Sequence, residues 1–147
     1  MENARKNLKV SAILVLIFAG LSLIRMIVDM IFLDTSSITV PEGAPENVVQ
    51  IAQIFISVVA LLLLLPHLYI GIKGIKIAKK PDSSKAHIVW GILLTVLTAI
   101  GLVYPVLALV QGNGEAFENV SELCSIFVDV VVLAEYVKYA IAVRKKI

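Results

Sequence analysis

Charged residues inside long apolar segments are the first candidates for chemistry in this chain. Arg25 lies about eight residues before the end of the first segment and Asp129 about nine residues into the last, so at about 1.5 Å of rise per helical residue their depths match. A charge at mid-bilayer costs at least about 2.5 to 3.5 kcal/mol and by default marks a functional site. We expect Arg25 to pair with Asp129. Asp29, on the same helix face as Arg25, is the alternative partner, and a pair that only fixes helix register is the structural alternative.

A column of carboxylates is predicted next to this pair. It consists of Asp29, Glu118, Glu122 and Asp129. Crowded carboxylates repel one another and favour a bound cation or proton, as in the pathway of an ion or a cationic solute. The alternative for Glu118 and Glu122 is that both are solvated at the end of a helix.

Secondary polar candidates lie deeper in the second and fourth segments. His67 follows Pro66, whose ring removes a backbone hydrogen bond and would kink the helix. Glu135 reaches a similar depth, so one hypothesis is a proton relay from His67 to Glu135. The other is that His67 is a structural histidine whose hydrogen bonds are satisfied inside the protein. Lys138, three residues after Glu135, is a ready partner for that carboxylate. Tyr104-Pro105 in the third segment predicts a local bend.

The composition indicates a single membrane domain covering residues 1–147. Hydrophobic residues make up 59% of the chain and the mean hydropathy is +0.95, which is too apolar for a soluble domain with a polar surface. A bilayer core needs roughly 20 mostly apolar residues per helix. Four stretches qualify, approximately 8–33, 48–77, 87–110 and 120–143. The third carries no formal charge and the fourth carries the most.

The positive charges predict an orientation in the membrane. They gather in the N-terminal tail, around the central connection and at the C-terminal end, whereas loops 34–47 and 111–119 have none. Because positively charged short loops stay in the cytoplasm, both termini and the central connection are predicted inside. The same residues could bind anionic lipids. They include Lys73, Lys76, Lys79, Lys80, Arg144, Lys145 and Lys146.

Small and polar residues recur along one face of each predicted helix. Examples are Gly71 and Gly74 in the second segment and Gly91 and Thr95 in the third. Small residues allow helix backbones to approach closely in lipid, and polar ones find partners across the interface. The sequence therefore predicts an all-α membrane protein, an antiparallel four-helix transmembrane bundle with these faces inward.

The sequence narrows the function without naming it. It contains no H-E-x-x-H, G-x-S-x-G or phosphate-binding glycine motif, so we expect no catalytic residues, metal, cofactor or nucleic-acid partner. The first hypothesis is a small transport or channel subunit, forming a homo-oligomer and using the polar core around Arg25, Asp29, Glu122 and Asp129. The second is a non-catalytic accessory protein beside a larger membrane complex or anionic lipids. Small size and short loops suggest a bacterial inner membrane.

Overall fold

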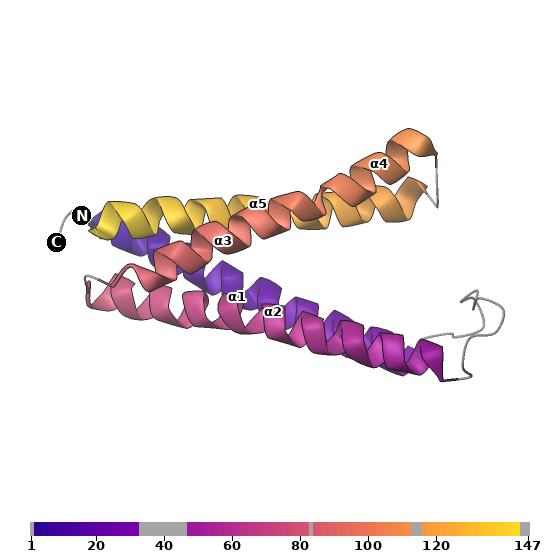
Figure 1. The fold of residues 1–147 in the computed structure, drawn as a ribbon. Coiled ribbons are helices and arrows are strands. Elements are labelled where there is room, and N and C mark those ends of the chain that lie inside the picture. The colour runs from indigo at the N-terminus through magenta and orange to yellow at the C-terminus, as the bar shows by residue number, and fades with distance from the viewer. Residues whose placement is uncertain (1, 33–46, 83, 113–115, 145–147) are drawn as a thin grey trace.

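The computed structural model is almost entirely helical over the residues that it describes, which are 2–32, 47–82, 84–112 and 116–144. This part of the chain contains no strand, so the all-helical prediction is confirmed. Its helices are α1 Glu2–Phe32, α2 Val48–Lys79, α3 Ala86–Gly101, α4 Val103–Gln111 and α5 Ala116–Arg144 (Figure 1). The side chains of Asp29 and Glu118, together with Lys145 and Lys146, lie outside the described residues.

Within the described residues, three stretches of helix are long and apolar enough to cross a membrane. They are Glu2–Val28, Gln50–Lys79 and Ala86–Gln111, the last of which combines α3 and α4. Helix α5 is not one of these three. Its 29 residues are sufficient for a span, but Glu122, Asp129, Glu135 and Lys138 interrupt its apolar sequence.

The third stretch is broken at Leu102, between α3 and α4. Pro105 has no N–H to donate to the carbonyl of Gly101, so the regular helical hydrogen bonding stops there. The backbone N–H of Leu102 donates at 3.2 Å to the carbonyl of Ala99, only three residues earlier. The helix is therefore interrupted just before Tyr104-Pro105, where the sequence predicts a local bend.

The helices form two arms that meet at one end and separate towards the other (Figure 1). One arm is α1 packed against α2. The other is α5 packed against α3 and α4, and the arms join where α1 contacts α5 and α2 contacts α3. The joined end holds the start of α1, the connection from α2 to α3 and the end of α5. The arrangement therefore resembles a V.

The hydrophobic core lies towards the joined end. Its members are contributed by four helices and include Leu8, Ala12, Val15, Ile70, Ile77, Ile88, Leu94, Leu133, Tyr136 and Ala140. The glycines of the small-residue faces make this packing close. A Cβ on Gly71 would lie 2.5 Å from Leu16 Cγ, and a Cβ on Gly91 would lie 2.9 Å from Val137 Cγ2. The small residues are thus where α2 approaches α1 and α3 approaches α5.

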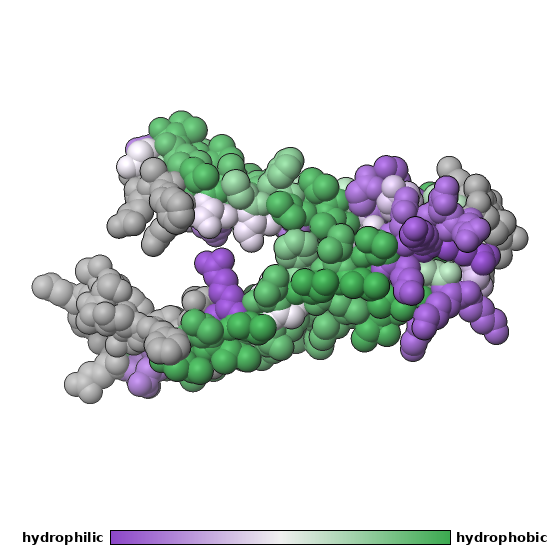
Figure 2. Space-filling view, turned by 180° about the vertical axis from the view of Figure 1, so that it is seen from behind, coloured by the Kyte–Doolittle hydropathy of each residue, from purple (hydrophilic) through white to green (hydrophobic). Residues whose placement is uncertain are grey.

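Large apolar side chains cover the outside of both arms. Ile17 of α1, Leu62 of α2, Ile100 of α3 and Phe127 of α5 are each at least half exposed. Figure 2 shows this hydrophobic surface over the length of the arms and a concentration of hydrophilic residues at the joined end. An apolar exterior of this extent is what a lipid environment stabilises and water does not.

Candidate functional site

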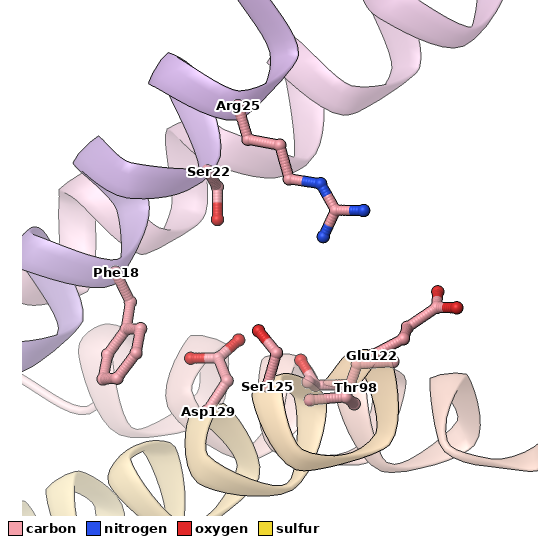
Figure 3. Close-up of a pocket in the computed structure, with 8 residues that line it drawn as sticks. Phe18, Ser22, Arg25, Thr98, Glu122, Ser125 and Asp129 are labelled. Carbon is pink, nitrogen blue, oxygen red and sulfur yellow. The ribbon is translucent and has the colours of Figure 1, made fainter. Parts of the chain in front are cut away.

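A polar pocket of about 210 Å³ lies between the two arms. Its walls come from three helices, and Figure 3 shows their side chains directed towards a shared space. Its lining residues are Phe18, Ser22 and Arg25 of α1, Thr98 of α3, and Glu122, Ser125, Ile126 and Asp129 of α5. The pocket exists because the arms diverge, which separates α1 from α5 beyond the core.

Three of the four residues predicted for the polar core line this one pocket. Arg25 extends from the α1 wall, and Glu122 and Asp129 belong to the facing α5 wall (Figure 3). The side chain of the fourth, Asp29, is outside the described residues. The pocket thus has one cationic group facing two carboxylates across a space in which Phe18 and Ile126 supply apolar surface.

Among the described residues, Asp129 pairs with His67 and not with Arg25, the partner expected from matching depths in the membrane. Ion pairs within 4.0 Å in this part of the chain are His67–Asp129, Lys73–Asp82 and Lys138–Glu135, so an Arg25–Asp129 pair is not among them. The Nε2 atom of His67 lies 4.0 Å from Oδ2 of Asp129. Matching depths allow a contact, but the divergence of α1 from α5 keeps the guanidinium on the opposite wall.

His67 is held by the helix that carries it. Its Nδ1 atom lies 3.0 Å from the backbone carbonyl oxygen of Leu63, one helical turn earlier. A carbonyl oxygen only accepts, so Nδ1 carries a hydrogen and donates it. Pro66 precedes His67 inside α2 and supplies no N–H. The imidazole is therefore oriented with Nε2 towards α5.

Asp129 is only partly satisfied by this contact. Its side chain is 25% exposed and that of His67 is 17% exposed. The second carboxylate oxygen of Asp129, Oδ1, is buried and has no hydrogen-bond partner within the described ranges. A buried, incompletely paired carboxylate is costly unless a proton or a cation compensates it.

Glu135 and Lys138 form a separate pair away from the pocket. The Nζ atom of Lys138 donates to Oε1 of Glu135 at 2.9 Å, and the same ammonium group lies 5.1 Å from the ring centre of Tyr139. Both charged side chains are largely exposed. Since Glu135 is engaged here and His67 contacts Asp129, the geometry does not favour a His67 to Glu135 relay.

A second group of buried polar atoms lies in the core at the joined end, and the sequence reasoning did not single it out. The rings of His87 in α3 and Tyr136 in α5 meet edge to face, with centroids 6.4 Å apart. Over the part of the chain that is described, the Tyr136 hydroxyl and both ring nitrogens of His87 have no hydrogen-bond partner. The available signal was that His87 and Tyr136 each belong to the small or polar face of their helix.

An ion pair closes the connection between α2 and α3. Lys73 donates from Nζ to Oδ2 of Asp82 at 2.7 Å, and the backbone N–H of Ser84 donates to Oδ1 of the same carboxylate at 2.7 Å. Together these two donors hold the pKa of Asp82 below its ordinary value of 3.8. The pair is partly buried and lies outside the pocket.

The described residues contain no group of three or more His, Cys, Asp and Glu side chains placed to hold a metal ion. Comparisons with protein-family models, curated proteins and solved structures found no match to this chain.

Proposed function

We propose that this chain is a four-span integral membrane protein, an antiparallel helical bundle with both termini in the cytoplasm. Three helical stretches have the required length and hydropathy. For the fourth, the 29 residues of α5 give about 44 Å at about 1.5 Å per residue, more than a bilayer core of about 30 Å. Its charged side chains need not face lipid unpaired, because Glu122 and Asp129 line the pocket and Glu135 pairs with Lys138.

The distribution of basic residues supports this orientation. Helix α1 begins, α2 ends and α5 ends at the joined end of the V, so Arg5, Lys76, Lys79 and Arg144 gather there. Positive charges next to spans favour the cytoplasmic side. The pocket would then open towards the outer side, in the plasma membrane of a bacterium as the short loops suggest.

The proposed activity is binding and transport of a small organic cation. The observation that carries this proposal is that Glu122 and Asp129 line one pocket of about 210 Å³ between two apolar-surfaced arms. Two carboxylates against one guanidinium leave a net negative charge on the described walls. Phe18 and Ile126 add apolar contact, and an aromatic face also attracts ammonium groups. The packed core around Leu133 and Tyr136 closes the cytoplasmic end of the pocket. Transport therefore requires that the two arms move relative to each other, or that the solute passes between subunits of a homo-oligomer.

Uptake of labelled tetraethylammonium into liposomes that contain the purified protein tests the activity. We expect saturable uptake with the wild type and at least a tenfold loss with Glu122→Gln or Asp129→Asn. Glu135→Gln is the matched control, because it removes a carboxylate from the same helix outside the pocket. Absence of saturable uptake with the wild type, or an equal loss with Glu135→Gln, would contradict the proposal.

The second candidate function is a non-catalytic accessory protein, and the basic joined end favours it. Lysines and arginines near that end can contact anionic lipids or the acidic surface of a larger membrane protein. They include Lys73, Lys76, Lys79, Lys80 and Arg144 within the described residues, with Lys145 and Lys146 following in the sequence. Purification of a stoichiometric partner from native membranes, together with no uptake in liposomes, would favour this function over transport.

A further inference from the structure

We propose that His67 and Asp129 bind one exchangeable proton between them, and that a cation entering the adjacent pocket displaces this proton. The inference deepens the proposed transport function and rests on it, because it assigns the proton as the ion exchanged for the cationic solute. It depends on three geometrical facts: the fixed orientation of the imidazole, the place of Asp129 in the pocket wall and the incomplete pairing of its carboxylate.

The orientation of His67 determines how many protons the pair can hold. Nδ1 keeps its hydrogen because it donates to the Leu63 carbonyl at 3.0 Å. A neutral imidazole therefore presents an unprotonated Nε2, an acceptor, to Oδ2 of Asp129 at 4.0 Å. Two acceptors facing each other repel. One added proton, on Nε2 or on Oδ2, turns this repulsion into attraction.

Asp129 connects the pair to the pocket. Oδ2 is directed at His67, whereas the residue as a whole lines the pocket with Glu122 and Arg25. Within the described residues its Oδ1 atom is buried without a hydrogen-bond partner. A cation in the pocket would therefore lie beside a carboxylate whose charge no described hydrogen-bond donor compensates at Oδ1.

The other described ionisable groups that line the pocket come from two helices. Helix α1 supplies Arg25 and α5 supplies Glu122, both in the pocket. Helix α3 faces the pocket with the uncharged Thr98, and its His87 packs instead against Tyr136 in the core. The neighbours of the pair in the pocket are thus one fixed cation and one further carboxylate, and Asp129 is the only carboxylate of the pocket within 4.0 Å of a histidine among the described side chains.

The exchange balances in charge and in atoms. With the pocket empty of solute, the added proton lies between Nε2 of His67 and Oδ2 of Asp129. There it neutralises the Asp129 carboxylate. When a monovalent organic cation binds at Asp129, it takes over that neutralisation, and the Nε2 proton passes to water. One proton leaves for each cation that enters, so the total charge of the site is unchanged.

Nitrogen NMR of histidine-labelled protein in lipid nanodiscs tests the proton site without any solute. The His67 resonances are identified by their loss in His67→Gln. At one fixed pH we expect Nδ1 of His67 to be protonated in every variant, and the Nε2 resonance in Asp129→Asn to move towards that of an unprotonated ring nitrogen. In the control Glu135→Gln the Nε2 resonance should match that of the wild type. An unprotonated Nδ1, or no difference between Asp129→Asn and the control, would overturn the inference.

Proton release on binding of tetraethylammonium tests the exchange. In weakly buffered nanodisc solution at a pH where the pair is protonated, the wild type should release close to one proton per bound cation, and its affinity should fall about tenfold for each unit of acidification. His67→Gln should bind the cation with no such release. Binding by the wild type without proton release would overturn the inference and leave the proposed function intact. No binding at all would contradict the proposed function and the exchange together, while the NMR measurement would still decide the proton site.

Discussion

Gly74 of α2 lies so close to the ring of Tyr136 in α5 that a Cβ on Gly74 would come within 2.5 Å of the Tyr136 Cε2 atom. The same Cβ would lie 2.8 Å from Cβ of Ala12 in α1. At Gly74, helix α2 is thus packed closely against both α5 of the other arm and α1 of its own arm. The V depends on a residue with no side chain at this position.

Gly74→Ala should therefore destabilise the joined end. The added methyl group would force Tyr136 or α1 to move, and overpacking of this kind costs about 1 to 3 kcal/mol. Thermal unfolding in detergent, followed by circular dichroism, measures the loss. Gly20→Ala is the matched control, since a Cβ there meets no described atom within 4 Å. An equal or smaller loss for Gly74→Ala than for Gly20→Ala would contradict the close contact.

Removal of the Tyr136 hydroxyl should leave the protein equally stable or make it more stable. This hydroxyl is buried without a hydrogen-bond partner among the residues described, and an unsatisfied buried polar group costs about 1 to 3 kcal/mol. We expect Tyr136→Phe to raise the free energy of unfolding by up to about 1 kcal/mol. Tyr136→Ala should lower it by about 3 to 5 kcal/mol, because the ring fills the core.

The exposed residue Tyr104 provides the control for that change. It is 72% exposed, so Tyr104→Phe should have no measurable effect on unfolding. A clear loss of stability in Tyr136→Phe, with none in Tyr104→Phe, would mean that the buried hydroxyl has a partner and that the description of this core is wrong.

The Asp82 carboxylate should make the connection between α2 and α3 sensitive to acid. Its pKa is lowered in the folded chain by the hydrogen bonds from Lys73 and Ser84. A carboxyl whose pKa is lowered by folding contributes stability that is complete above its ordinary pKa of 3.8 and is lost as the pH falls through the lower folded value. Hydrogen exchange of residues 80–86 should therefore accelerate relative to the rest of the chain below that pH. In Asp82→Asn the connection should exchange faster at neutral pH, with no additional acceleration in acid.

Arg25 and Asp129 should have opposite effects on cation binding. Both line the pocket, but the guanidinium repels a cationic solute and the carboxylate attracts it. We expect Arg25→Gln to tighten tetraethylammonium binding by about three- to tenfold and Asp129→Asn to weaken it by at least tenfold. Isothermal titration in nanodiscs gives both affinities. If both variants weaken binding equally, the two residues support the structure of the pocket and do not set its charge preference.

Much of the fold could be predicted from the sequence because the elements are long and strongly patterned. Segments 48–77 and 87–110 correspond closely to α2 and to α3 with α4, and Pro105 accounts for the break between the latter two. The small-residue faces anticipated the burial of Gly71, Gly74 and Gly91. These features follow from local sequence and from the exclusion of unpaired backbone groups from lipid.

The details of the polar site depend on relations between helices that no single helix encodes. Depth along the membrane placed Arg25 and Asp129 at matching levels, with Glu122 in a column of carboxylates next to them, and all three line one pocket. Depth could not show that the arms diverge, which separates Arg25 from Asp129. It also could not show that His67 lies next to Asp129, while Glu135 pairs with Lys138. Partner choice is set by the angle between arms and by helix rotation, which hydrophobic periodicity leaves open.

Labelling of a cysteine at position 125 tests the central claim most directly, namely that a cation-selective pocket between the arms opens to the outer side of the membrane. Ser125 lines the pocket next to Glu122 and Asp129. In a chain with Cys124 replaced by alanine, Ser125→Cys should react in intact cells with a cationic, membrane-impermeant thiol reagent, and tetraethylammonium should slow the reaction. Val131→Cys, on an exposed apolar part of the same helix, should not react. Reaction of position 125 only from the cytoplasmic side, or equally with positions 125 and 131, would contradict the account.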